Sequence, residues 1–341
     1  MKKTAAWFLR VCISGLIAFC LLTLFCVLYY NVPVHYSTID GATDYSWECN
    51  QFYSRATEGF AFGKTNNEGY LNTFDYSENT DIDILVMGSS HMEAYQVAMD
   101  ESTAAVLGSL FPDRTVYNIG ISGHTLLECA DNLNAAVAKY KPSQYVLIET
   151  TNLSLNDQQL LSAINETVRD IPSRSGGLLG LLQKNQFLRL LYSQLKEFMK
   201  NSDQPKTSGS SEHDPAEINE APQKASYGNE ALYTELLAKL QNTVSGSGAQ
   251  LIIVYHPHLR INEDGSASAL SDRDTAAFFA DICRKTQVLF LDMSDIFLSR
   301  YEEDHVLPYG FSNTSVGSGH LNRNGHAMIA DAVYDLIKEE K

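Results

Sequence analysis

Short apolar runs alternate with segments of helical composition along most of the chain. The apolar runs predict strands over 84–87, 115–121, 144–149, 250–255 and 288–291. The helical segments cover 94–110, 125–140, 230–244, 275–286 and 324–338. Ile84 to Met87 is apolar at every position, which is typical of a strand buried on both faces of a parallel sheet. The alternation predicts an α/β fold with a doubly wound parallel sheet.

A longer apolar run, Val11 to Tyr30, contains twenty residues without a charge and follows Lys2, Lys3 and Arg10. Its length is enough to cross a bilayer as a helix. The end of the run offers no convincing cleavage site, so we interpret it as an uncleaved signal anchor and not as a removable signal peptide. The positive charges before it keep the N-terminus in the cytoplasm and place residues from about 31 outside, so the predicted location is the cell membrane.

Three parts follow from this pattern. Residues 1–30 are the cytoplasmic tip and anchor, 31–80 are a polar and aromatic juxtamembrane segment, and 81–341 are the α/β domain. Residues 155–228 interrupt the alternation with a helical stretch near 180–199 and a Ser-, Pro-, Lys- and Glu-rich stretch at 201–226. The second stretch is typical of a flexible surface loop, and a lid or a docking element for a partner is the alternative.

Charge and cysteine content narrow the class of protein. The formal net charge of −16 argues against nucleic acid as a partner, because neutralising phosphates needs clustered Lys and Arg. Three of the six cysteines lie in or beside the apolar run, and the rest indicate neither a disulfide framework nor a zinc site. The pair in His256-Pro-His258 lacks further ligands at suitable spacing. We therefore expect no metal and no cofactor.

Four turns carry the candidate chemistry. Gly88-Ser-Ser90, Ser122-Gly123 and Thr151-Asn152 each follow a predicted strand, and Gly319-His320 precedes the last helix. The ends of parallel strands meet at one edge of a sheet, where such folds place their ligands. Ser90 as nucleophile, His320 as base, and the Gly123 amide and Asn152 side chain as oxyanion donors would make an acyl-transfer site. An ordinary turn with a serine N-cap has the same local pattern as Gly88-Ser-Ser90.

These four segments resemble the sequence blocks of the SGNH (GDSL-like) hydrolase superfamily, which contribute Ser, Gly, Asn and His in that order. The blocks are Gly88-Ser89-Ser90, Asn118-Ile-Gly-Ile-Ser-Gly123, Glu149-Thr-Thr-Asn152 and Gly319-His-Leu-Asn-Arg-Asn-Gly325. The resemblance spans most of residues 81–341. It implies a three-layer α/β/α flavodoxin-like sheet and ester or acyl-group chemistry.

The anchored Gly-Ser-Ser form is similar to surface proteins that work in the acylation of envelope polymers, including the DltD family. The resemblance therefore implies an extracytoplasmic serine acyl-hydrolase or acyltransferase acting on O-acyl esters, O-acetyl above all, of an envelope glycan or polymer. Membrane lipid around the anchor and a membrane acyltransferase are the other expected partners. Ser89, His91 and His124 adjoin the site residues and are candidates for substrate contact.

Two positions depart from the family pattern. Ser89 stands where many members have Asp, and Gly317 stands three residues before His320, where an Asp usually orients the histidine. Three replacements are open: a backbone carbonyl near Gly317, the Ser318 hydroxyl, or a carboxylate of Glu302-Glu303-Asp304. The departure at Gly317 also keeps an alternative function open. In this alternative the chain is a non-catalytic accessory protein that binds a glycan or a membrane acyltransferase.

Overall fold

The computed structural model describes residues 2–31, 35–36, 46–165, 185–202, 229–270 and 273–340. Its central sheet has five parallel strands: β6 (Ile84–Met87), β7 (Val116–Asn118), β8 (Tyr145–Thr150), β9 (Gln250–Tyr255) and β12 (Leu289–Asp292). They lie in the order β7-β6-β8-β9-β12. In chain order this is 2-1-3-4-5, the flavodoxin-like arrangement. The five predicted strands and the predicted fold class are confirmed.

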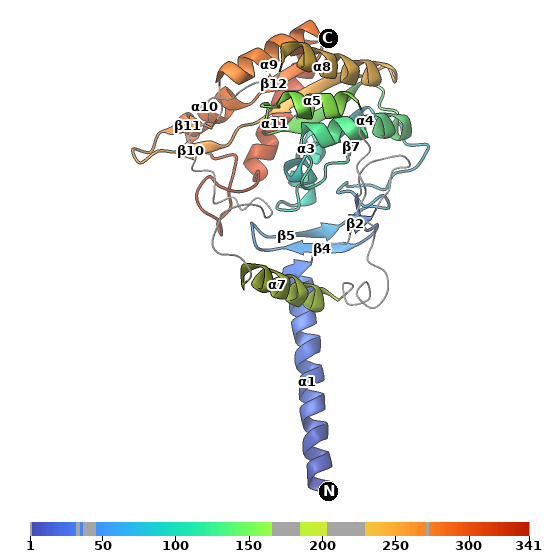
Figure 1. Ribbon diagram of the computed structural model, residues 1–341, viewed down its shortest axis with the longest axis vertical. Coiled ribbons are helices and arrows are strands. Elements are labelled where there is room, and N and C mark those ends of the chain that lie inside the picture. The colour runs from blue at the N-terminus through green and yellow to red at the C-terminus, as the bar shows by residue number, and fades with distance from the viewer. Residues whose placement is uncertain are drawn as a thin grey trace.

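Helices cover both faces of this sheet (Figure 1). Successive side chains of a strand point to opposite faces, so Leu85 and Met87 pack on one side while Ile84 and Val86 pack on the other. The first side holds α4 (Leu126–Tyr140), α5 (Asp157–Ile164), α8 (Glu230–Ser245) and α9 (Arg273–Lys285). The second side holds α3 (Thr103–Leu110), α10 (Ser294–Asp304) and α11 (Arg323–Glu339). The result is a three-layer α/β/α domain.

The helix predicted over 94–110 is α-helical only from residue 103 onward. A short α2 (Ser90–Glu93) ends at Ala94, whose φ of 62° is left-handed. A 3₁₀ turn, η1 (Met99–Glu101), follows, and α3 begins only after Ser102, whose side chain accepts the Ala105 N–H. A serine cap satisfies an otherwise unpaired amide at a helix start, so it sets the boundary locally.

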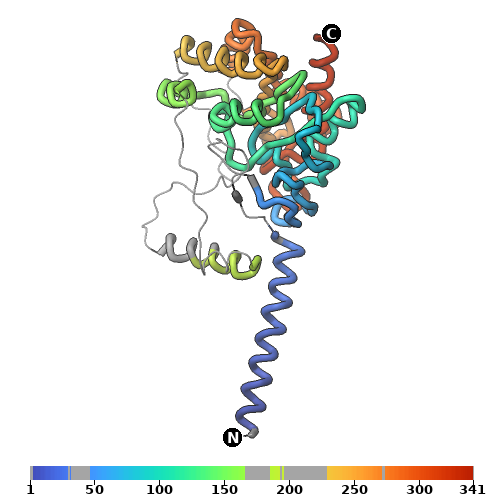
Figure 2. Tube along the Cα trace, turned by 90° about the vertical axis from the view of Figure 1, so that its right-hand side faces the viewer, coloured from blue at the N-terminus to red at the C-terminus, as the bar shows by residue number. Residues whose placement is uncertain are grey.

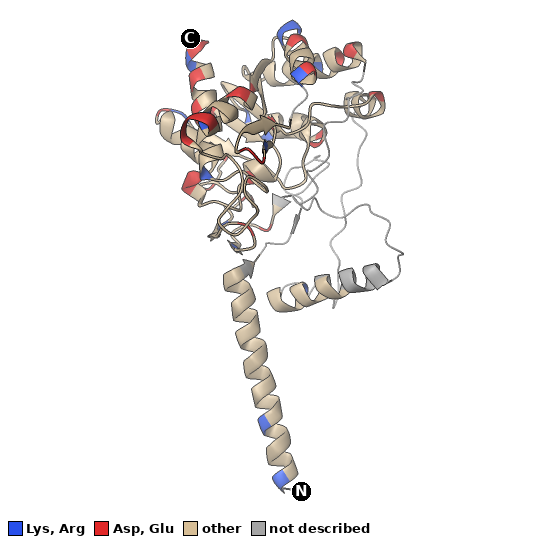
Figure 3. Cartoon of the chain, turned by 90° about the vertical axis from the view of Figure 1, so that its left-hand side faces the viewer, with Lys and Arg blue, Asp and Glu red and all other residues tan. Residues whose placement is uncertain are grey.

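The N-terminal helix α1 (Lys2–Tyr29) continues directly into β1 (Tyr30–Asn31). At 1.5 Å per residue its 28 residues are about 42 Å long, more than the hydrocarbon core of a bilayer, which is about 30 Å thick. Figure 3 shows basic residues only toward its N-terminal end. The helix is long and apolar enough to cross a membrane, a property that signal sequences share.

Part of the predicted juxtamembrane segment forms a small sheet at the base of the domain. The strand β1 pairs antiparallel with β4 (Phe52–Arg55), which pairs with β5 (Ala61–Lys64). Two shorter pairs, β2 (His35–Tyr36) with β3 (Ser46–Trp47) and β10 (Leu259–Ile261) with β11 (Ala267–Ala269), were not predicted. The hairpin of β4 and β5 lies between α1 and the large sheet (Figure 1).

The insertion at 155–228 contributes α5 and a second helix, α7 (Gln186–Ser202), where helical composition was predicted. This helix lies beside α1 (Figure 2). The ring of Phe187 packs edge-on against Phe19 at 5.9 Å, and Asn185 Nδ2 donates to Thr23 Oγ1 at 3.3 Å. A flexible loop was predicted over 201–226, and all of it except residues 201 and 202 lies outside the described residues.

Candidate active site

The turn after β6 brings Ser90 to the carboxyl edge of the sheet. Gly88 is required by close packing, because a Cβ at this position would lie 2.6 Å from the Glu149 carboxylate. Ser89 then caps α2, its Oγ accepting the His91 N–H at 3.2 Å. Ser90 is therefore the first residue of α2, with a half-buried side chain. This is where the sequence pattern placed the nucleophile.

His320 meets Ser90 from the loop before α11. Its Nε2 lies 2.8 Å from Ser90 Oγ, and its Nδ1 lies 2.6 Å from Glu58 Oε2. The backbone N–H of His320 also donates to Glu58 Oε1. A carboxylate, an imidazole and a serine hydroxyl in this order form the constellation that activates serine for attack on acyl groups.

Burial of Glu58 favours its neutral form, but hydrogen bonds from His320 and the charge of that imidazole outweigh burial and hold the Glu58 pKa below its ordinary value. The carboxylate is therefore ionised at neutral pH. An ionised Glu58 accepts a proton-bearing Nδ1, which leaves His320 Nε2 free to accept the Ser90 proton.

Two glycines allow the Glu58 contact. Gly59 has φ of 69° in the β4–β5 turn, and its N–H donates to Asn313 Oδ1 at 2.8 Å, which ties the turn to the loop before His320. Gly319 has φ of 99°, and a Cβ on it would overlap the Glu58 carboxylate. A glycine at 319 therefore lets the carboxylate reach the backbone of His320.

All three replacements expected for the missing Asp are wrong. His320 Nδ1 is held by Glu58 and not by a carbonyl near Gly317, while the Ser318 hydroxyl donates to a carbonyl of its own turn at 3.1 Å. The run Glu302–Asp304 ends α10, where Asp304 pairs with an arginine one turn earlier at 2.9 Å. The orienting carboxylate is Glu58, which comes from the segment 31–80. No motif marks it, because its link to His320 spans 262 residues of sequence.

A second carboxylate, Glu149, binds the turn Gly88–Ser90, which we call the nucleophile turn. Glu149 Oε2 accepts the Ser89 N–H at 2.7 Å and the Ser89 hydroxyl at 2.8 Å, and Oε1 lies 2.7 Å from His256 Nε2. His256 Nδ1 in turn lies 2.5 Å from the Tyr309 hydroxyl. Burial opposes ionisation of Glu149, but the charge and hydrogen bonds of His256 and Ser89 lower its pKa. Ser89, the departure in the first block, is thus a partner of a buried carboxylate.

The predicted oxyanion donors lie at strand ends on the same edge. Gly123 has φ of 89° in an exposed turn after β7, and open space lies where its Cβ would be. Asn152 is exposed two residues after β8, where its Oδ1 accepts the Ser154 N–H at 2.8 Å. Because Oδ1 faces Ser154, the side-chain NH₂ of Asn152 points away from Ser154. Their role as donors stays a prediction.

A third carboxylate, Glu93, connects α2 to the Gly123 turn. Its side chain is fully buried and accepts hydrogen bonds from the Ser122 hydroxyl and from the Trp47 indole N–H. Burial raises the pKa of Glu93 to about 7, against the smaller opposing effect of these hydrogen bonds. Sequence reasoning did not single out Glu93, because no motif distinguishes it from an ordinary glutamate in a short helix.

Two histidines proposed for substrate contact are buried. His91 Nδ1 accepts the Leu321 N–H at 3.1 Å, and its ring centre lies 5.1 Å from that of His320. Burial and the neighbouring imidazoles hold the His91 pKa well below 6.5, so the ring is neutral. His124 is buried beside the Gly123 turn. Among the described residues, no group of three or more His, Cys, Asp and Glu side chains is arranged to hold a metal ion.

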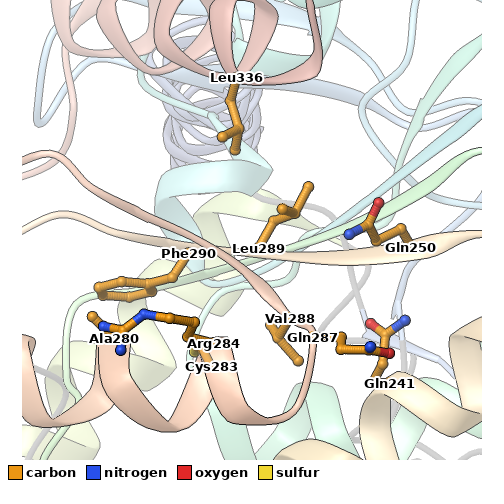
Figure 4. Close-up of a pocket in the computed structure, with 10 residues that line it drawn as sticks. All are labelled: Gln241, Gln250, Ala280, Cys283, Arg284, Gln287, Val288, Leu289, Phe290 and Leu336. Carbon is orange, nitrogen blue, oxygen red and sulfur yellow. The ribbon is translucent and has the colours of Figure 1, made fainter. Parts of the chain in front are cut away.

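An open pocket of about 680 Å³ lies elsewhere, lined by residues of α8, α9, β9, β12 and α11 (Figure 4). Its lining includes Gln250 and Leu289, the first residues of β9 and β12. The pocket is therefore at the amino edge of the sheet, opposite the edge that carries Ser90.

No family model and no curated protein sequence matches the chain. Among solved structures it is similar to the protein YxiM of Bacillus subtilis, with 15% identity and a TM-score of 0.40, over 82% of this chain and 60% of that one. A two-domain esterase active on acetylated mannans matches with 11% identity and a TM-score of 0.40, over 76% and 49%. The chain thus spans 60% and 49% of the length of these two proteins.

A putative lipolytic protein of the G-D-S-L family from Desulfitobacterium hafniense matches with 14% identity and a TM-score of 0.38. This match covers 75% of the present chain and 99% of the other. The structural neighbours thus include a protein of the superfamily that the four sequence blocks resemble.

Proposed function

We propose that the chain is a membrane-anchored, extracytoplasmic serine acyl-hydrolase or acyltransferase. It acts on O-acyl esters, O-acetyl above all, of a cell-envelope glycan or polymer. The observation that carries the proposal is the continuous set of contacts from Glu58 through His320 to Ser90, with distances of 2.6 and 2.8 Å. An imidazole held on one side by a carboxylate and on the other by a serine hydroxyl is suited to move the serine proton.

In the first step, Ser90 Oγ attacks the acyl carbonyl while His320 Nε2 takes its proton. Glu58 holds the imidazole in the required tautomer and stabilises the imidazolium that forms. The amides of Ser90 and Gly123 and the Asn152 side chain supply the oxyanion donors. Collapse of the tetrahedral intermediate expels the alcohol, which takes the proton from His320, and leaves an acyl group on Ser90.

The second step decides between the two activities. Water, activated by His320, releases the free acid in an esterase, whereas a sugar hydroxyl in the same position receives the acyl group in a transferase. The residues that bind the acyl group are the same in both. A membrane acyltransferase that supplies acyl groups is a partner consistent with either route.

The anchor supports the location. Lys2, Lys3 and Arg10 precede the apolar part of α1, and basic residues on this side of a span stay in the cytoplasm. The domain then lies outside, where envelope polymers occur. The accessory-protein alternative rested on the missing carboxylate at Gly317 and on the insertion at 155–228. The contact of Glu58 with His320 removes the first of these reasons.

Labelling with a fluorophosphonate probe tests the proposal. The full chain is used in detergent, because Val27 and Tyr30 contact the domain and a version that begins at residue 31 would lose both contacts. We expect labelling of the wild-type protein and none with Ser90→Ala or His320→Ala. The control is Ser318→Ala, beside His320 but bonded within its own turn. A folded wild-type protein that neither labels nor cleaves a simple acetyl ester would contradict the hydrolase proposal.

A further inference from the structure

The helix α1 runs directly into β1, a strand of the small sheet. The helix ends at Tyr29, and β1 begins at Tyr30 and pairs with β4. The Ser54 hydroxyl in β4 donates to the Val27 carbonyl of α1 at 2.9 Å, and Asn31 Nδ2 donates to the Phe52 carbonyl at 2.7 Å. These bonds fix the β4–β5 hairpin to the outer end of the helix, so the height of the hairpin above a bilayer is set by α1.

This hairpin presents large apolar side chains to the outside. Phe60 and Phe62 are 65% and 62% exposed, with ring centres 6.1 Å apart, and Phe52 on the neighbouring strand is also exposed. Single exposed apolar residues are normal on a protein surface, but a group of exposed aromatic rings marks an interaction site. Aromatic rings are also enriched at the level of lipid headgroups.

A second apolar group lies on α7. Leu191, Tyr192 and Leu195 are each 44–52% exposed, and their spacing puts them on one side of the helix. Figures 1 and 2 show α7 crossing the outer half of α1, where Phe187 contacts Phe19. An amphipathic helix in this position relative to a span is typical of one that lies in the membrane interface.

The heights of the two groups agree with one bilayer. Thr23, whose hydroxyl contacts Asn185 just before α7, is 13 residues beyond Arg10, or about 20 Å along the helix axis. Phe19, which contacts Phe187 of α7, is nine residues beyond Arg10, or about 14 Å. If Arg10 lies at the inner boundary of a core about 30 Å thick, the contacts of α7 with α1 lie about 10 to 16 Å below the outer boundary. The shallower of these contacts is at the depth to which interfacial helices bury their apolar faces, about 5–10 Å. Tyr30, about 30 Å beyond Arg10, then lies at the outer boundary, level with the hairpin.

We propose that Phe52, Phe60 and Phe62 of the small sheet and the exposed apolar side of α7 together form a membrane-contacting surface, whose occupant is the outer leaflet of the bilayer. The proposal rests on the membrane-anchored part of the proposed function. Its consequence concerns the active site, because Glu58 lies four residues after Ser54, a reach of at most about 14 Å. Docking of the surface therefore holds the Ser90 site next to the lipid headgroups, where it meets esters that are presented at the membrane.

Quenching of tryptophan fluorescence by brominated phospholipids tests the surface. The full chain is reconstituted in vesicles, and Phe60→Trp and Leu195→Trp are compared with Leu161→Trp, an exposed leucine on α5 at the far side of the domain. We expect the emission added by the first two substitutions to be quenched several-fold more than that added at position 161. The wild-type protein has two tryptophans, of which Trp47 is buried in the domain. Quenching of wild-type emission therefore reports mainly whether Trp7, exposed on α1, is in the lipid.

The outcomes separate the surface from the anchor. Quenching of Trp7 without extra quenching at positions 60 and 195 overturns the surface and leaves the anchored hydrolase intact. Loss of quenching at all positions overturns the anchor and the surface together. Quenching at 60 and 195 that disappears as the protein-to-lipid ratio rises overturns the proposal in favour of a second copy of the chain as occupant.

Activity gives a second readout. The double variant Leu191→Glu/Leu195→Glu places two charges on the apolar side of α7, outside the Ser90 site. We expect turnover of an acetyl ester embedded in vesicles to fall several-fold and turnover of a soluble acetyl ester to stay unchanged. The control, Leu161→Glu, should change neither. A double variant whose turnover of the vesicle-embedded ester is unchanged, or falls no more than its turnover of the soluble ester, would overturn the proposal.

Discussion

Two Glu–His pairs flank the nucleophile turn, and they differ mainly in their access to solvent. The oxygen–nitrogen distances are nearly equal, 2.6 Å for Glu58–His320 and 2.7 Å for Glu149–His256. The side chains of Glu58 and His320 are 9% and 20% exposed, whereas those of Glu149 and His256 are 0% exposed. In both pairs the contact lowers the pKa of the glutamate despite its burial. Electrostatics alone therefore does not tell the pair proposed to be catalytic from the fully buried one.

The two pairs differ in the group that contacts the second ring nitrogen of the histidine, the one that does not face the glutamate. His320 Nε2 contacts the half-buried hydroxyl of Ser90, which a substrate can reach, and His256 Nδ1 contacts the buried hydroxyl of Tyr309. Burial together with the nearby Glu149 raises the pKa of Tyr309 well above 10, so this hydroxyl stays protonated. The first pair can transfer a proton to and from a reacting group, and the second holds the turn in place.

The largest effect on activity is expected when Ser90 or His320 is replaced. Ser90→Ala and His320→Ala should each lower kcat for an acetyl ester by about 10⁴- to 10⁶-fold, because the nucleophile and its base act as a unit. Initial rates at saturating ester, with folding checked by circular dichroism, measure this. Activity within tenfold of wild type in either variant would remove the proposed roles.

Glu58→Gln is the next test, since it keeps the shape of the side chain and removes its charge. We expect kcat to fall by about 10²- to 10⁴-fold through loss of the correct histidine tautomer and of imidazolium stabilisation, with KM nearly unchanged. Asp304→Asn, in the run that the sequence offered as an alternative, is the matched control and should retain full activity. If the two results are reversed, the assignment of Glu58 is wrong.

The second pair should respond in stability. Glu149→Ala leaves His256 and the Ser89 amide without their buried partner, and breaking a buried pair costs about 3–5 kcal/mol in the free energy of unfolding. Urea denaturation measures this value. Asp295→Asn, in an exposed pair with Arg273, should change it little. A Glu149 variant with wild-type stability and a kcat reduced as far as in Glu58→Gln would make the two pairs equivalent and contradict the comparison.

Glu93, a buried carboxylate without a histidine partner, sharpens the comparison through pH. Its pKa is raised to about 7 by burial, so between about pH 4.5 and 7 the unfolded chain ionises at this residue while the folded protein stays protonated. The stabilisation of the folded state by a protonated Glu93 is fully present below about pH 4.5. It is lost progressively as pH rises, and the loss is complete above about pH 7. A raised pKa of this size corresponds to about 3 kcal/mol.

Glu93→Gln removes this dependence while an amide side chain can still bond Ser122 and Trp47. The expected result is a melting temperature that falls less between pH 5 and pH 8 than in the wild-type protein, measured by calorimetry at both pH values. A parallel fall in the two proteins would show that Glu93 is ionised in the folded state throughout.

Local patterns were sufficient for the large sheet and for the two residues at the centre of the site. The apolar run at 84–87 and the glycine after it predict a buried strand that ends in a tight turn, because both properties depend on neighbours in sequence. Ser90 and His320 follow from such turns, and the structure places them 2.8 Å apart. The β4–β5 hairpin was missed because its strands have four residues each and its phenylalanines point outward, so no alternation of buried and exposed positions marks it.

The sequence by itself determined the succession of strands and helices along the chain, the anchor-like helix and the presence of a serine and a histidine at strand or helix ends. Each of these depends on hydrophobic period or turn chemistry over a few residues. Only the tertiary structure decided which carboxylate orients His320. Glu58 reaches it because α1, β1 and β4 fix one end of the hairpin and Asn313 fixes the other. A carboxylate in a polar loop has no local signature, and its role arises from the three-dimensional distance to an imidazole.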